Sequence, residues 1–203
     1  MPDLISQTKD ALRKTPSFVY LYMNDLDVAG HSDGVGSEKW LAALAMIDLM
    51  FANLIKEMPQ GTRIWLTSDH GMINVGEKIV IGEGNRLLEN IATIGGEPRA
   101  RHLYLSPSHD SAAARSDVAS VWQEFLGDRV DIYTREQAVD NNLFGELVSA
   151  DSLDRMGEVI AVAQGTVVLI DPTRIDKESS MVGHHGADSD IETQVGLLTT
   201  TLN

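Results

Sequence analysis

Three short clusters, each flanked by glycine, combine aspartate with histidine or pair two histidines. They are the segments 27–31, 68–71 and 183–186. Four of the 6 histidines of the chain lie in these clusters. Carboxylate oxygens together with imidazole nitrogens suit a hydrolytic metal such as zinc. The clusters therefore predict one metal site whose ligands come from distant parts of the sequence.

The residue types suit the cleavage of a phosphoester, which resists attack because its negative charge repels nucleophiles. Two divalent ions about 3.5–4 Å apart can hold the attacking and the leaving oxygen together. Asp27 and His31 are expected to bind one ion, with Gly30 providing a tight turn. His185 completes the ligand shell of one ion, although the sequence leaves open whether His184 takes that role.

Asp69 and His70 are neighbours, which in a strand would point to opposite faces. A turn at Gly71 removes that constraint and lets both side chains reach a metal. Each cluster taken alone is also compatible with a solvated surface loop, in which an aspartate forms an Asx turn. The coincidence of three clusters, two of them directly after apolar runs, favours the joint site.

Composition limits the class of protein. The 203 residues are 43% hydrophobic, enough for one core or for a core with a smaller inserted lobe. The net charge of −14 argues against a protein that follows a nucleic-acid backbone, but bound metals would still permit a phosphate-bearing small molecule. Because cysteine is absent, a metal must have nitrogen and oxygen ligands. Neither a leader-like start nor an apolar run of about 20 residues is present, so we expect a soluble chain and leave its location open.

The apolar runs predict elements that deliver the first two clusters. Residues 17–23 read as a buried strand that leads to Asp27 and His31 in a loop. Apolar residues spaced by three and four predict a helix over 38–58, and 63–67 form a second strand directly before Asp69. A strand, a helix and a strand predict a parallel α/β sheet, which gathers ligands at the carboxyl ends of its strands.

The segment 82–150 differs in character and is predicted to be an inserted lobe. The flanking segments, 1–81 and 151–203, then make up a metal-binding core. Within the lobe we expect strands at 101–105 and 130–133 and helices at 111–125 and 135–141. The core resumes with strands at 158–163 and 166–170, which we expect to form a hairpin turned at Gln164–Gly165, and a closing strand is expected at 194–200.

The clusters carry a resemblance to a known family. Asp27-x-x-Gly30-His31, Thr67-Ser-Asp-His-Gly-Met72 and Gly183-His-His-Gly186 resemble the metal motifs of the type I phosphodiesterase/nucleotide pyrophosphatase family of the alkaline phosphatase superfamily. The segment 96–105 is similar to bacterial members. The resemblance implies a three-layer α/β/α sandwich with an inserted small α+β cap lobe.

The resemblance also implies ligands and chemistry. Asp27, His31 and His185 would hold one zinc ion, and Asp69 and His70 a second. The complete enzyme would hydrolyse phosphodiester or pyrophosphate bonds of nucleotide-like substrates through a covalent phospho-Thr or phospho-Ser intermediate. The alternatives are a phosphomonoesterase, a sulfatase or a phosphomutase of the same superfamily, or a non-catalytic module that keeps the scaffold.

The chain departs from the family pattern at its start. Family members carry a strand with a further metal-binding aspartate and then the nucleophile well upstream of the first motif, whereas 26 residues precede Asp27 here. We therefore expect a C-terminal portion, truncated at the N-terminus, that contains no catalytic nucleophile and is inactive in isolation. Exposed apolar sheet edges in such a portion predict a homo-oligomer.

Overall fold

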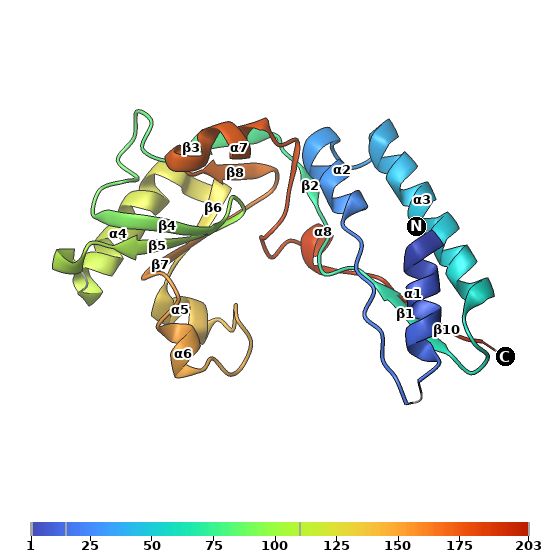
Figure 1. Ribbon diagram of the computed structural model, residues 1–203. Helices are drawn as coiled ribbons and strands as arrows, with labels where there is room; N and C mark the ends of the chain where they lie inside the picture. Colours follow the sequence, from blue (N-terminus) through green and yellow to red (C-terminus); the bar gives the residue numbers. More distant parts are fainter. Residues whose placement is uncertain (1, 15, 110, 203) are drawn as a thin grey trace.

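The computed structural model describes residues 2–14, 16–109 and 111–202, and it forms two regions joined by thin connections (Figure 1). One, here called the helical region, contains three helices and two strands. They are α1 (Pro2–Leu12), α2 (Asp25–Asp33), α3 (Glu38–Glu57), β1 (Arg63–Thr67) and β10 (Leu197–Thr201). Helix α3 and strand β1 confirm the elements predicted at 38–58 and 63–67. Helix α3 begins where the Ser37 hydroxyl accepts a hydrogen bond from the Trp40 N–H.

The other, here called the sheet region, runs from β3 to α7 (Figure 1). Its strands are β3 (Glu77–Val80), β4 (Ile91–Glu97), β5 (Ala100–Leu105), β6 (Val130–Thr134), β7 (Val159–Ala163) and β8 (Val167–Ile170). Its helices are α4 (Ala112–Leu126), α5 (Arg135–Asp140), α6 (Ala150–Leu153) and α7 (Ile175–Ser180). The strands and helices predicted between 101 and 141 are confirmed.

The junction between the two regions is short. It consists of β2 (Ile73–Asn74) paired antiparallel with β9 (Gly183–His184), and of the one-turn helix α8 (Asp190–Thr193). Because β2 follows the second cluster and β9 contains part of the third, this small ladder brings distant segments of the sequence side by side. The junction therefore positions the candidate site.

The core of the sheet region lies between a four-stranded antiparallel sheet, in the order β4-β5-β7-β6, and helix α4. Trp122 of α4 is fully buried there, and its indole N–H donates to the Leu87 carbonyl oxygen. Strand β8 pairs in parallel with β3, and both contribute to the same core. The α/β fold class predicted from the sequence is thus confirmed in the described residues.

The predicted hairpin of residues 158–170 is wrong. Strand β7 pairs with β5 and β6, whereas β8 pairs with β3. A turn does join the two strands, where the Val167 N–H donates to the Gln164 carbonyl oxygen. Strand β7 pairs with β5 along one edge and with β6 along the other, so neither edge is free for β8. Every residue of β7 and β8 is buried, so both faces of each strand are covered. The division into a core and the lobe 82–150 stays a proposal, and β7 belongs to the same sheet as the strands of that lobe.

The strand predicted at residues 17–23 is also not formed. The segment is extended and alternates exposed with half-buried residues, but it forms no ladder with any described strand. Phe18, Tyr20 and Tyr22 all lie on its exposed side. The predicted parallel pairing with 63–67 is therefore absent, because β1 pairs instead with β10, antiparallel. The closing strand predicted at 194–200 is confirmed as β10.

The loop predicted for Asp27 and His31 is a helix, α2. Two acidic residues, Asp25 and Asp27, lie in its first turn and favour the positive end of the helix dipole. The helix ends at Gly34, whose φ of 90° suits glycine. None of the described helices is long and apolar enough to span a membrane.

Candidate metal centre

Helix α2 presents Asp27 and His31 on one face, because residues four apart are neighbours on a helix. His31 Nε2 lies 3.5 Å from Asp27 Oδ1. The other ring nitrogen, Nδ1, is 2.8 Å from the carbonyl oxygen of Gly183, which fixes the tautomer with the proton on Nδ1. Nε2 of His31 therefore faces the same space as the Asp27 carboxylate.

Gly30 permits a close approach between the first and third clusters. A Cβ at this position would lie 2.5 Å from Met72 Sδ, and a Cβ at Gly183 would lie 2.5 Å from the Gly30 carbonyl oxygen. The sequence predicted a tight turn at Gly30. Its observed role is instead to let Met72 and the 183–186 segment pack directly against helix α2.

Asp69 and His70 follow β1 at the turn into β2. His70 Nδ1 is 2.9 Å from the Gly71 carbonyl oxygen, and His70 Nε2 is 3.7 Å from Asp69 Oδ1. The Asp69 side chain is about two-thirds exposed, whereas that of His70 is largely covered. The pair therefore lies at the open edge of the site, and Asp69 remains accessible to solvent.

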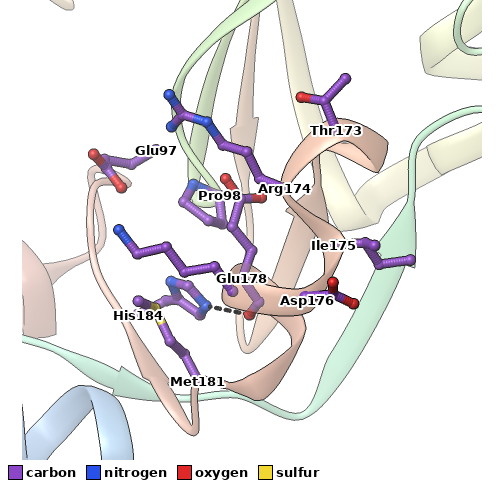
Figure 2. A pocket seen from close by; sticks show the side chains of 10 residues that line it. Glu97, Pro98, Thr173, Arg174, Ile175, Asp176, Glu178, Met181 and His184 are labelled. Carbon is purple, nitrogen blue, oxygen red and sulfur yellow. Dashed lines mark hydrogen bonds between the residues drawn. The ribbon is translucent and has the colours of Figure 1, made fainter.

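The two adjacent histidines of the third cluster point to different places. The His184 ring is 2% exposed, and its Nε2 is 3.2 Å from the Glu178 carbonyl oxygen. Figure 2 shows it among the side chains that line a cavity, Glu97 and Arg174 included. The cavity has a volume of about 530 Å³. Burial lowers the pKa of His184, and the nearby His31 lowers it further. His184 is thus turned toward that cavity.

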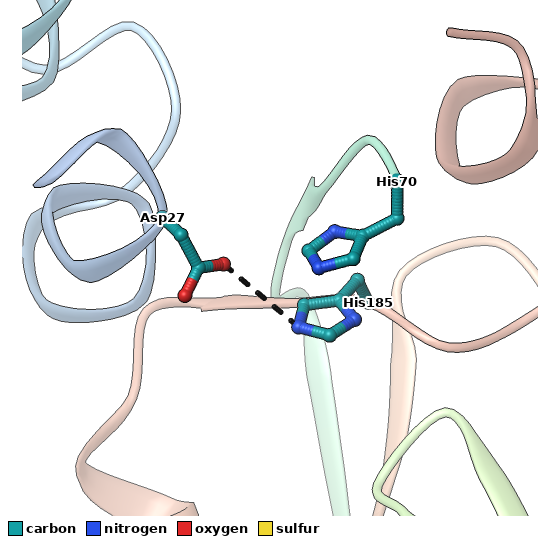
Figure 3. A group of neighbouring side chains, drawn as sticks. All are labelled: Asp27, His70 and His185. Carbon is teal, nitrogen blue, oxygen red and sulfur yellow. Dashed lines mark ion pairs between the residues drawn. The ribbon is translucent and has the colours of Figure 1, made fainter. Parts of the chain in front are cut away.

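His185 is turned toward Asp27 and His70 instead. Its ring stacks on that of His70 with centroids 3.5 Å apart, and its Nε2 is 3.9 Å from Asp27 Oδ1 (Figure 3). One ligand atom from each of the three residues lies within 4.8 Å of the others. Burial lowers the pKa of His185, and His70 and His31 lower it further, which keeps the ring neutral and able to ligate a metal.

The surroundings of Asp27 Oδ1 indicate whether these residues suit a metal ion. It is buried without a hydrogen-bond partner, the one such side-chain atom found in the part of the chain that the structure describes. The imidazole nitrogens at 3.5 and 3.9 Å are too far for ordinary hydrogen bonds. A buried carboxylate oxygen without a partner is costly, and a cation would satisfy it. The donor set of carboxylate and imidazole groups fits zinc.

The structure brings all five predicted ligands into one neighbourhood. The tightest group consists of Asp27, His70 and His185, so it combines residues that the sequence assigned to different ions. His31 borders this group through Asp27, and Asp69 borders it through His70. The division of the five residues between two ions remains a prediction.

Two buried residues that adjoin the site were missed from the sequence. Arg99 and Glu192 form an ion pair in which Arg99 Nη2 lies 2.6 Å from Glu192 Oε2. Arg99 precedes β5, where Arg101 shares the inward-facing register of Leu103 and Leu105, and such arginines in an apolar alternation could have signalled a buried ion pair. Nothing in the sequence near Glu192 indicates its partner.

The chain is similar to a known protein family in sequence and to solved proteins in structure. Residues 2–188 match the family described as type I phosphodiesterase/nucleotide pyrophosphatase. Among solved structures, an inactive variant of murine ectonucleotide pyrophosphatase/phosphodiesterase 5 in complex with AMP is similar with a TM-score of 0.76 and 17% identity. The human protein of the same name gives a TM-score of 0.75, also at 17% identity. No curated protein matches the chain in sequence.

The matches also define how much of these proteins the chain represents. Each alignment covers 98% of this chain and 51% of the murine or human chain, so the chain spans about half the length of these neighbours. At this level of identity the likeness establishes the fold. The family match, which extends over nearly the whole sequence and contains all three clusters, establishes that the chain belongs to the type I phosphodiesterase/nucleotide pyrophosphatase family.

Proposed function

We propose that this chain is the metal-binding part of a divalent-metal-dependent hydrolase that cleaves phosphodiester or pyrophosphate bonds in nucleotide-like substrates. The observation that carries the proposal is Asp27 Oδ1, a buried carboxylate oxygen without a hydrogen-bond partner beside three imidazoles. Family membership supports the reaction class. The AMP bound to a similar structure supports a nucleotide-like substrate.

The charge of the chain favours a bound metal for this substrate class. The net charge of −14 repels a phosphate group, and the candidate site adds the carboxylates of Asp27 and Asp69. When bound, divalent ions would stabilise the negative charge that develops on the phosphoryl oxygens during the reaction. The residues of this chain would hold the ions, and backbone carbonyl groups orient the imidazoles of His31 and His70.

We assign Asp27, His31 and His185 to one ion and Asp69 with His70 to the other, with zinc as the favoured metal. The helix face shared by Asp27 and His31 supports the first set, as does the contact of His185 with Asp27. The 3.7 Å separation of Asp69 and His70 supports the second. His70 stacks on His185, which places the two sets of ligands next to each other.

The nucleophile is proposed to lie outside this chain, which spans about half the length of the similar solved structures. Its attack would form the covalent phospho-Thr or phospho-Ser intermediate, and the ligands described above would contribute metal binding only. We therefore expect negligible turnover of bis-p-nitrophenyl phosphate by the isolated chain. A longer protein that contains this chain should cleave that diester faster than p-nitrophenyl phosphate. The opposite preference would assign it to the phosphomonoesterases.

Zinc binding tests the proposal directly. Isothermal titration of the chain with zinc should show binding, and Asp27→Asn should weaken it by at least about tenfold, because it removes a charged ligand. Asp48→Asn is the matched control, since Asp48 is an exposed aspartate of α3 and the same charge is removed far from the clusters. Equal affinity of the wild type and Asp27→Asn, or no zinc binding by the wild type, would contradict the proposed metal site.

A further inference from the structure

Glu192 connects the segments that carry His70 and His185. We propose that it is a positioning residue that holds these two histidines in one site, an inference that rests on the proposed metal-binding function. Glu192 lies in the one-turn helix α8 and touches neither imidazole through its hydrogen bonds. Its side chain bonds to the segment after His185, and its main chain bonds to the residue after His70.

The side chain of Glu192 organises the loop that follows His185. The Ala187 N–H donates to Oε1 at 3.0 Å, and the Ser189 hydroxyl donates to Oε2 at 2.5 Å. Arg99 donates from Nε to Oε1 and from Nη2 to Oε2, at 3.1 and 2.6 Å. Both carboxylate oxygens are therefore engaged, one of them by the amide two residues beyond His185.

The main chain of Glu192 holds the residue after His70. The Gly71 N–H donates to the Glu192 carbonyl oxygen at 2.7 Å. The two backbones approach so closely that a Cβ at Gly71 would lie 1.9 Å from the Ile191 carbonyl oxygen. Gly71 was predicted to provide a turn, and its close contact with α8 is a separate reason for glycine there. Glu192 thus bonds both to the backbone that follows His70 and to the backbone that follows His185, the two residues whose rings stack.

The linkage is rigid because it is buried and anchored. Glu192 is 2% exposed and Arg99 is fully buried. Burial alone would raise the pKa of the Glu192 carboxyl, but the hydrogen bonds from Arg99, Ser189 and Ala187 outweigh it and lower that pKa. The carboxylate therefore stays ionised. Arg99 also donates to the Val167 carbonyl oxygen at 2.7 Å, which fixes the assembly to the sheet region.

A buried ion pair can also serve stability alone, so the experiment requires a second ion pair located elsewhere. Arg135 and Glu158 provide one, with side chains 20% and 15% exposed, against 0% and 1% for Arg99 and Glu192. The Glu158 carboxylate accepts a hydrogen bond from the Leu105 N–H and one from Arg135, the same combination of backbone amide and arginine that Glu192 has. None of the hydrogen bonds found for Glu158 in the described residues leads to a histidine cluster.

Two measurements on the intact chain test the proposal with Glu192→Gln and Glu158→Gln. The first is the nuclear Overhauser effect between the ring protons of His70 and His185 in metal-free protein, which reports on their stacking. The second is the zinc dissociation constant. Glu192→Gln places amide hydrogens against the donors of Arg99 and Ser189. We expect it to remove the ring contact and to weaken zinc binding by about 10- to 100-fold. Glu158→Gln should leave both unchanged.

If Glu192→Gln does not fold, the double variant Arg99→Met/Glu192→Leu tests the positioning role of Glu192 instead. Apolar replacement of a buried ion pair often preserves stability, but this one removes the acceptor of the Ala187 amide. A folded variant that keeps both the ring contact and the wild-type zinc affinity would overturn the proposal. If the wild-type chain binds no zinc, the proposed function fails, and the ring contact still decides whether Glu192 positions the histidines.

Discussion

The strands of the sheet region and those of the helical region differ sharply in burial. All residues of β7 and β8 are buried, whereas four of the 5 residues of β10 are exposed and its partner β1 buries only Ile64 fully. The difference lies partly in composition, since β7 and β8 are wholly apolar and β10 contains three threonines, and partly in the neighbours. Helix α4 and further strands cover the sheet region, but one face of the β1–β10 ladder has no covering layer in the described residues. Apolar strands become core only where a second layer covers them.

The candidate site combines both regions. Asp27 lies in α2 of the helical region, and His70 follows β1 of that region. His185 directly follows β9, which comes after the sheet region in the chain (Figure 1). Buried hydrogen bonds that Arg99 donates to Glu192 and to the Val167 carbonyl oxygen tie the site to the sheet region, and glycine contacts at positions 30 and 183 tie it to helix α2. The distances between the ligand atoms of Asp27, His70 and His185 therefore depend on the contacts that hold the two regions against the site.

The largest expected effect is on the core of the sheet region. Trp122→Ala should reduce the free energy of unfolding by about 3–5 kcal/mol, because it empties a fully buried site and leaves the Leu87 carbonyl oxygen without the indole N–H. Trp65→Ala on β1 should cost about 1 kcal/mol or less, since that side chain is 53% exposed. Urea denaturation followed by circular dichroism measures both. Similar losses for the two variants would show that the regions do not differ as their burial indicates.

A second prediction concerns the uncovered side of the helical region. Phe18 and Tyr20 are 78% and 77% exposed on a segment with unpaired edges, and Leu197 and Leu198 of β10 are also exposed. Such surfaces favour pairing with a second copy of the chain. We expect concentration-dependent self-association in sedimentation velocity, and Phe18→Ser/Tyr20→Ser should shift the chain toward the monomer.

Leu147→Ser is the matched control for this prediction. Leu147 is 94% exposed, so the variant also removes exposed apolar surface, one side chain instead of two, but in a loop of the sheet region. It should leave self-association unchanged. A wild-type chain that stays monomeric at high concentration would contradict the expectation, as would an equal effect of Leu147→Ser.

Much of the fold was predictable because local patterns decide it. The apolar stripe of α3, the capping serine at 37 and the breaker Pro59 are local signals that mark the helix and its ends. The alternation in β5 and the caps of α4 and α5 act in the same way. The five candidate ligands could be named because short glycine-flanked motifs depend little on distant contacts. Their closeness in space, however, depends on a ladder of two residues between β2 and β9.

The remainder depends on long-range partners that sequence periodicity does not reveal. Residues 17–23 have strand character, but no described strand forms a ladder with them, and β7 and β8 pair with different neighbours. The helical state of Asp27 and His31 was hidden because glycine at position 30 argues locally for a turn. Packing of Met72 and Gly183 against that glycine outweighs its low helix propensity.

The smallest expected effect is a pH dependence of stability within the sheet region. His102 Nδ1 accepts a hydrogen bond from the Gly157 N–H, so the ring is neutral when folded. Burial lowers its pKa below the ordinary 6.5, and the charge of Arg135 lowers it further. The unfolded chain therefore binds a proton near pH 6.5 that the folded chain resists. Stability is complete above that pH and is lost as the pH falls from there toward the folded pKa.

Replacing His102 isolates this contribution, because burial also lowers the pKa of His184 and His185, and their protonation changes stability in the same direction. His102→Asn can keep an acceptor for the Gly157 amide without a titrating ring. The variant should lose less free energy of unfolding between pH 7 and pH 5 than the wild type, in urea denaturation at each pH. Its loss should still exceed zero, because the two site histidines continue to titrate. Equal losses in both proteins would mean that His102 is protonated as readily in the sheet region as in the unfolded chain.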